Sequence, residues 1–164
     1  MNQPFQELVI KGVFWAKAER RTDVRGWLAE TFRADWLMAL GLSEAQPVMA
    51  YVSVTRPGVA RGPHEHRFQT DYFGFLGPSD FKLFLWDNRP AATSYGKRLT
   101  KVLGESNPGL VIVPPGVVHA YKNIGTVDGL VLNYPNRLYA GQDRKEPVDE
   151  IRHEDNPDSP FQLE

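Results

Sequence analysis

Three of the four histidines in this 164-residue chain lie in two short segments that carry other polar side chains. The first segment contains His64, His66 and Asp71, and the second contains His119. Side chains two residues apart in an extended strand point to the same face, so we expect His64 and His66 to face the same way. Asp71 follows a bend expected after His66 and can rejoin them. The spacing therefore predicts a functional cluster.

The cluster of His64, His66, Asp71 and His119 has the composition of a metal site. Three imidazoles and one carboxylate suit divalent Zn, Mn, Fe, Ni or Co, and the sequence does not choose among these metals. The chain has no cysteine, so thiolate ligands, thiolate nucleophiles and disulfides are excluded. An imidazole can also act as a general base near neutral pH. Because one nitrogen of His64 cannot bind a metal and also accept a proton, these two roles compete.

The elements that must position these residues are predicted to be short strands. Apolar runs bounded by Gly, Pro, Asn or Asp occur at residues 8–16, 48–55, 72–76, 81–86, 110–113 and 129–134. Regularly spaced short strands are typical of an antiparallel sandwich or barrel. One helical stretch is expected within residues 27–40, with Gly41 as its stop. From about Arg144 onward the chain is charged and interrupted by proline, which indicates at most a short irregular element.

Length and composition predict one domain that spans residues 1–164. Hydrophobic residues make up 41% of the chain and charged residues 24%, as in ordinary soluble proteins. The net charge of -1 creates no overall field that would attract nucleic acid or acidic lipid. The sequence has no visible signal peptide and no apolar run of about 18 residues. We therefore expect a cytoplasmic protein with neither a nucleic-acid nor a membrane partner.

The two histidine segments resemble the paired motifs of the cupin superfamily. The first reads glycine, five residues, His64-x-His66 and then an acidic residue, with Asp71 in the place of the usual glutamate. The second matches Pro-x-Gly, two residues, His119, three residues and asparagine. This resemblance implies an all-β fold, the cupin double-stranded β-helix or jelly-roll barrel, with one or two short helices.

A narrower resemblance, to dTDP-4-dehydrorhamnose 3,5-epimerases, extends from about residue 20 to residue 158. Residues 23–30 look like the D-x-R-G-x-x-x-E segment of these enzymes, and residues 58–64 are similar to their G-V-x-R-G-L-H. Residues 86–96 and 113–119 resemble two later segments of the family. The resemblance implies an isomerase or epimerase that acts on a nucleotide-linked, dTDP-type 4-keto-6-deoxy sugar. Such an enzyme removes and returns a proton next to the ketone.

The resemblance also implies roles for single residues. His64 is the expected base, Asp155 the carboxylate that orients it, and Tyr134 the acid that returns a proton from the opposite face. Substrate contacts are expected from Arg61, Arg25, Glu30 and His119. Arg25 and Glu30 can come from a partner subunit, since a homodimer is expected. No organic cofactor is expected.

One departure from the family pattern changes the expected chemistry. The family has a lysine that steadies the enolate, and here Asp71 lies near the position of that lysine. A carboxylate has the wrong sign for this task, whereas a metal bound by the cluster restores a positive charge and polarises the ketone oxygen. Two alternatives stay open. One is a metal-dependent cupin of another class, such as a dioxygenase or a sugar-phosphate isomerase, and the other is a non-catalytic sugar-binding cupin.

Overall fold

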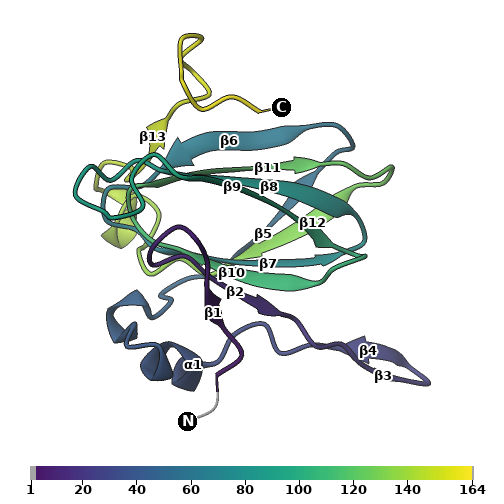
Figure 1. Ribbon diagram of the computed structural model, residues 1–164. Helices are drawn as coiled ribbons and strands as arrows, with labels where there is room; N and C mark the ends of the chain where they lie inside the picture. Colours follow the sequence, from purple (N-terminus) through teal and green to yellow (C-terminus); the bar gives the residue numbers. More distant parts are fainter. Residues whose placement is uncertain (1–2, 164) are drawn as a thin grey trace.

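The computed structural model describes residues 3–163 as two facing antiparallel β-sheets (Figure 1). The larger sheet contains, in spatial order, β1 (Gln6–Glu7), β2 (Phe14–Lys17), β10 (Gly109–Val113), β7 (Asp71–Gly77), β12 (Gly129–Asn133) and β5 (Tyr51–Thr55). The smaller sheet contains β13 (Ile151–Arg152), β6 (Ala60–Glu65), β11 (Val117–Asn123), β8 (Asp80–Asp87) and β9 (Arg98–Gly104). The predicted all-β cupin barrel is confirmed.

The barrel interior is filled by side chains that alternate along the central strands. On β7 the inward side chains are Asp71, Phe73 and Phe75, two residues apart, as the pleat of a strand requires. Phe75 and Phe81 are fully buried, and their ring centroids lie 5.7 Å apart. At the start of β7, before Phe73, the inward-facing residue is Asp71, and polar side chains surround it instead of apolar ones. One end of the barrel is therefore an aromatic core and the other end is available for chemistry.

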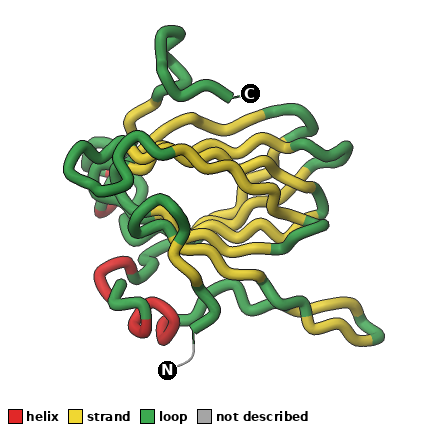
Figure 2. The backbone as a smooth tube through the Cα atoms, in the orientation of Figure 1, coloured by secondary structure: helices red, strands yellow, loops and turns green. Residues whose placement is uncertain are grey.

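Each sheet is also covered on its outer face. Helix α1 (Ala34–Ala39) places the buried Leu37 in the cluster that covers the larger sheet, together with Tyr72 and Ile112. The C-terminal segment packs Phe161 against Trp86 on the smaller sheet. Figure 2 shows these two coverings on opposite sides of the barrel. Both sheets are thus buried on two faces, which explains why β7 and β10 are apolar nearly throughout.

The structure differs from the sequence-based strands at two places and defines the bounds of the expected helix. Residues 8–16 are not one strand, because the chain turns at Gly12, whose φ is +77°, before β2 begins. The helical stretch expected within residues 27–40 is confirmed as α1, which begins at Ala34, while residues 26–28 belong to the hairpin of β3 (Arg21–Asp23) and β4 (Gly26–Leu28). No strand was expected at β9, whose sequence RLTKVLG mixes apolar residues with polar and charged ones.

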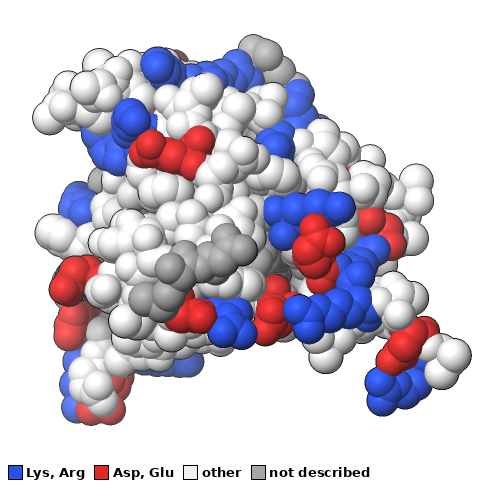
Figure 3. All heavy atoms as spheres, turned by 60° about the horizontal axis from the view of Figure 1, so that its bottom comes forward, with Lys and Arg blue, Asp and Glu red and all other residues white. Residues whose placement is uncertain are grey.

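The hairpin of β3 and β4 projects away from the barrel (Figure 1). Val24 at its tip is fully exposed. Charged side chains of both signs lie interspersed on the face seen in Figure 3, in keeping with the net charge of -1. Within residues 3–163, no helix has the length and apolar character needed to cross a membrane.

Candidate active site

The histidines of the cluster meet at one end of the barrel interior. His64 on β6 pairs in register with His119 on β11, and their ring centroids are 4.5 Å apart. His66 directly follows β6, with its ring centroid 5.7 Å from that of His64 and 5.8 Å from that of His119. One ring nitrogen of each imidazole lies within 4.8 Å of the other two. The structure thus brings all three histidines together.

Gly62 permits the close approach of the two histidine-bearing strands. Its φ of +81° lies in a region that L side chains rarely adopt. A Cβ at this position would lie 2.6 Å from the carbonyl oxygen of His119 and 3.1 Å from Nδ1 of His64. Any larger residue would therefore push β6 and β11 apart at the site itself.

Asp71 is the centre of the hydrogen-bonding pattern around the cluster. Its Oδ2 lies 3.2 Å from Nε2 of His66 and 3.3 Å from Nε2 of His119. Its Oδ1 accepts hydrogen bonds from Nε2 of Gln69 at 2.9 Å and from Nδ2 of Asn133 at 2.8 Å. The carboxylate is 1% exposed, so its charge is balanced by these neighbours rather than by water.

Backbone carbonyls fix the orientation of two of the imidazoles. Nδ1 of His66 donates to the carbonyl oxygen of Asp149, and Nδ1 of His119 donates to that of Val117 at 3.1 Å. Both rings therefore direct Nε2 towards Asp71. Nε2 of His119 is buried and makes no hydrogen bond, although Asp71 is near. Nε2 of His119 and Oδ2 of Asp71 are thus two acceptor atoms only 3.3 Å apart, and a cation bound by both would stabilise this arrangement.

The pKa values of the cluster follow from burial and from the charge of Asp71. Burial alone would raise the pKa of Asp71, but its hydrogen bond with His66 and the nearby imidazoles lower it to about 2. Burial would lower the pKa of His66, but Asp71 and the Asp149 carbonyl outweigh it and raise the value to about 9. Burial, reinforced by neighbouring imidazoles, lowers the pKa of His64 to about 2, and burial also lowers the pKa of His119. Without a metal, the cluster holds one cation, one anion and two neutral rings at neutral pH.

Two carboxylates lie beside His64, and neither belongs to Asp155. Nδ1 of His64 is 3.8 Å from Oε1 of Glu150 and 3.9 Å from Oε1 of Glu154. Asp155 is exposed and lies outside the pocket, in the turn that follows β13. The structure therefore places Glu150 and Glu154, and not Asp155, next to His64.

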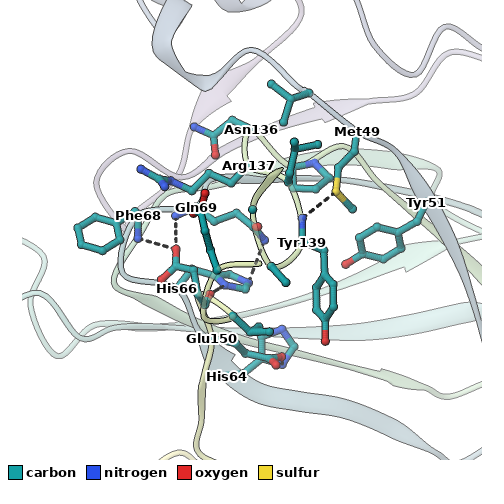
Figure 4. Close-up of a pocket in the computed structure, with 18 of the residues that line it drawn as sticks. Met49, Tyr51, His64, His66, Phe68, Gln69, Asn136, Arg137, Tyr139 and Glu150 are labelled. Atoms are coloured by element: carbon teal, nitrogen blue, oxygen red, sulfur yellow. Dashed lines mark hydrogen bonds and ion pairs between the residues drawn. The ribbon is translucent and has the colours of Figure 1, made fainter. Parts of the chain in front are cut away.

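A pocket of about 1300 Å³ opens next to the histidines (Figure 4). Much of its wall is the segment 135–150, which follows β12. Arg61 lines the pocket, and its guanidinium donates to Oγ1 of Thr55 at 3.0 Å and to the Val54 carbonyl at 2.8 Å. Figure 4 shows the ring of Tyr139 directed towards the part of the pocket where His64 lies. The pocket therefore combines a histidine, a tyrosine and an arginine.

Tyr134 does not line this pocket. Asn133 points into the barrel, where it bonds Asp71, so the next residue must point outwards. The hydroxyl of Tyr134 shares a hydrogen bond with Thr31 at 2.8 Å, and its ring stacks on Phe32 in the outer cluster. The alternation of side chains along β12 is the sequence signal that places Tyr134 on the outer face.

Arg25 and Glu30 also lie away from the pocket of their own chain. Arg25 is at the tip of the projecting hairpin, where it pairs with Asp23. Glu30 pairs with Arg33 at 3.1 Å. Within residues 3–163, neither side chain reaches the histidine cluster.

Sequence comparisons connect the chain to sugar-nucleotide epimerases. The family model for dTDP-4-dehydrorhamnose 3,5-epimerase matches residues 7–146. A probable low-salt glycan biosynthesis epimerase of Haloferax volcanii is 36% identical over 125 residues, which are 76% of this chain and 77% of that protein. A spore coat polysaccharide biosynthesis protein of Bacillus subtilis is 28% identical over 131 residues, 80% of this chain and 83% of that protein.

Solved structures agree on the fold. NovW, a 4-keto-6-deoxy sugar epimerase from Streptomyces spheroides, has a TM-score of 0.78 at 23% identity, covering 98% of this chain and 81% of its own. ChmJ, a 3'-monoepimerase from Streptomyces bikiniensis, has a TM-score of 0.79 at 19% identity, covering 96% of this chain and 77% of its own. That ChmJ structure is a double mutant, histidine to asparagine and tyrosine to phenylalanine, in complex with dTDP. The predicted sugar-nucleotide epimerase is confirmed at the level of the family, because the chain belongs to the dTDP-4-dehydrorhamnose 3,5-epimerase family.

Proposed function

We propose that this protein epimerises or isomerises a dTDP-type 4-keto-6-deoxy sugar by removing and returning a proton next to the ketone. The observation that carries the proposal is the neutral, pocket-lining His64 with two carboxylates on its Nδ1 side. The pocket volume of about 1300 Å³ exceeds the ~300–1,000 Å³ of ordinary small-molecule sites. Such a volume suits a ligand that combines a sugar, a diphosphate and a nucleoside.

His64 acts as the base in this proposal. Burial keeps the ring neutral at physiological pH, which is the state that can accept a proton, but burial also weakens the ring as a base, so a neighbouring carboxylate has to stabilise the protonated form. Glu150 and Glu154 lie close enough to steady the imidazolium once it forms. Because both carboxylates lie on the Nδ1 side, Nε2 is the atom left to face the sugar.

Tyr139 takes the role that the sequence assigned to Tyr134. Its side chain is 58% exposed and lines the same pocket as His64, so its hydroxyl can deliver a proton to the sugar. The hydroxyl of Tyr51 is already bonded by Asn133, and burial raises the pKa of Tyr51 to about 12. Tyr51 is therefore the poorer acid of the two.

The diphosphate is assigned to Arg61. Among the described residues, its guanidinium donates only to a hydroxyl and a carbonyl. It therefore has no carboxylate partner to lose when it pairs with a phosphate. Arg25 and Glu30 can take part only from a second copy of the chain, since their hairpin projects away from its own pocket. A homodimer is therefore part of the proposal.

A divalent metal at His66, Asp71 and His119 is the second part of the proposal. The unpaired Nε2 of the buried His119, together with the two Nδ1–H bonds to carbonyls, is typical of imidazoles prepared for a metal. The family lysine that would stabilise the developing enolate is missing here, and a metal held at these residues would supply the positive charge in its place. In this arrangement His64 stays free to act as the base, which resolves the competition between its two expected roles.

The chemistry is tested by proton exchange from heavy water into dTDP-4-keto-6-deoxyglucose. Wild-type protein should introduce deuterium next to the ketone, and H64N should slow exchange by about 10²–10⁴-fold. Y139F should keep the first proton removal but impair inversion, whereas Y134F, the same change on the outer face, should leave both unchanged. Absence of exchange with any keto-sugar nucleotide would contradict the proposal and favour a sugar-binding cupin or another cupin chemistry.

The metal is tested separately by elemental analysis of the purified protein. Wild-type and H64N proteins should each contain close to one equivalent of Zn, Mn, Fe, Ni or Co, whereas H66A should lose it. Chelation should slow proton exchange, and added metal should restore it. Metal-free protein with full exchange would contradict this second part and leave the first part intact.

A further inference from the structure

Asp149 ties the wall of the pocket to the histidine cluster from more than 80 residues away. Its carboxylate accepts hydrogen bonds from the backbone N–H groups of Arg67, Phe68 and Gln69, each at 2.9 Å. Its own backbone carbonyl accepts the hydrogen bond from Nδ1 of His66. One residue thus holds both the turn after β6 and the ring that precedes that turn.

The turn that Asp149 holds contains Gln69, which makes a second contact with the histidine cluster. Gln69, whose N–H bonds the Asp149 carboxylate, donates its side-chain amide to Asp71 at 2.9 Å. The same amide nitrogen lies 3.2 Å from Nε2 of His66. Both immediate neighbours of Asp71 on this side therefore depend on the position of Asp149.

We propose that Asp149 is a positioning residue that orients His66 and Gln69 towards Asp71. The carbonyl of Asp149 holds the proton of His66 on Nδ1, so that Nε2 faces the interior of the cluster. The carboxylate of Asp149 fixes that carbonyl relative to the turn, because its three N–H bonds cannot form in another register. Asp149 itself lies in segment 135–150, so the placement of the pocket wall and the orientation of His66 are linked.

Two measurements on Asp149→Asn test this inference. Asn is nearly the same size as Asp, but its amide group replaces one acceptor oxygen with a donor and removes the charge that strengthens the three bonds. The matched control is Asp143→Asn, the same change in the same segment. Asp143 does not line the pocket and is bonded only by Gln142 and Lys145 among the described residues.

The first measurement follows the Nδ1 proton of His66 in ¹H–¹⁵N spectra of metal-free protein. This proton should exchange slowly with water in the wild type and in D143N, and at least about tenfold faster in D149N. An unchanged exchange rate in D149N would overturn the proposal. If D149N does not fold by circular dichroism, Asp149→Ser, whose hydroxyl still accepts one of the three N–H bonds, takes its place.

The second measurement is Zn²⁺ affinity, determined by competition with a chromophoric chelator, and it rests on the proposed metal site. D149N should bind Zn²⁺ about 10–100-fold more weakly than the wild type, and D143N should bind it equally well. Equal affinity in D149N and the wild type would also overturn the positioning role. If the wild type binds no Zn²⁺, the metal proposal fails, and the proton exchange of His66 alone decides the role of Asp149.

Discussion

Replacement of Gly62 by alanine should disturb the active site more than its size suggests. Two costs add at this position. A non-glycine residue at φ +81° costs about 1–2 kcal/mol in backbone energy. The new Cβ would lie 2.6 Å from the His119 carbonyl oxygen, and relief of such overpacking costs a further ~1–3 kcal/mol. We expect a total loss of about 2–5 kcal/mol, a large part of the ~5–15 kcal/mol stability of a typical domain.

Gly96→Ala separates these two costs. Gly96 has nearly the same φ, +76°, but nothing lies within 4 Å of its would-be Cβ. Urea denaturation should therefore show a loss of only about 1–2 kcal/mol for G96A. The difference between the two variants measures the contact between β6 and β11.

The same comparison has a functional readout. G62A should also weaken Zn²⁺ binding, because relief of the contact with the His119 carbonyl displaces His119, one of the proposed ligands, whereas G96A should leave Zn²⁺ affinity unchanged. Equal losses of stability in G62A and G96A would refute the reasoning, since they would show that the strands have room for a methyl group.

Three further predictions concern the rest of the molecule. Burial would raise the pKa of Asp87, but hydrogen bonds from Arg89 and Ser94 lower it. The ionised carboxylate therefore stabilises the folded protein above about pH 4, and this stabilisation is lost as the pH falls through the lowered pKa of the folded state. In urea at pH 7, the free energy of unfolding of D87N should therefore be about 1.5–3 kcal/mol lower than that of the wild type. A difference in unfolding free energy that is not smaller at pH 3 would contradict this. Arg61→Ala should reduce the thermal shift produced by dTDP while the protein stays folded, and an equal shift would place the diphosphate elsewhere. Phe161→Ala should cost about 1–3 kcal/mol in urea with unchanged Zn²⁺ affinity, and unchanged stability would show that its ring does not hold the C-terminal segment on the sheet.

The sequence was sufficient to predict the β-barrel and the histidine cluster. Two features were readable along the chain, the regular spacing of apolar runs and the alternation of side chains in a strand. The His64-x-His66 spacing placed two imidazoles on one face, and the turn before Asp71 returned its carboxylate to them. Local rules of this kind act within a few residues, so they can be applied before any tertiary structure is known.

The partners of these residues could not be predicted in the same way, because they come from segments far apart in the chain. Asp149 reaches His66 across 83 residues, and Glu150 and Glu154 meet His64 only when the segment after β12 folds over the barrel end. The same folding brings Tyr139 to the pocket, while the pleat of β12 turns Tyr134 to the outside. The sequence therefore determined which residue types gather at the end of the barrel. Tertiary packing decided which neighbour each one has, because strand pairing and loop closure join residues without regard to their separation in the chain.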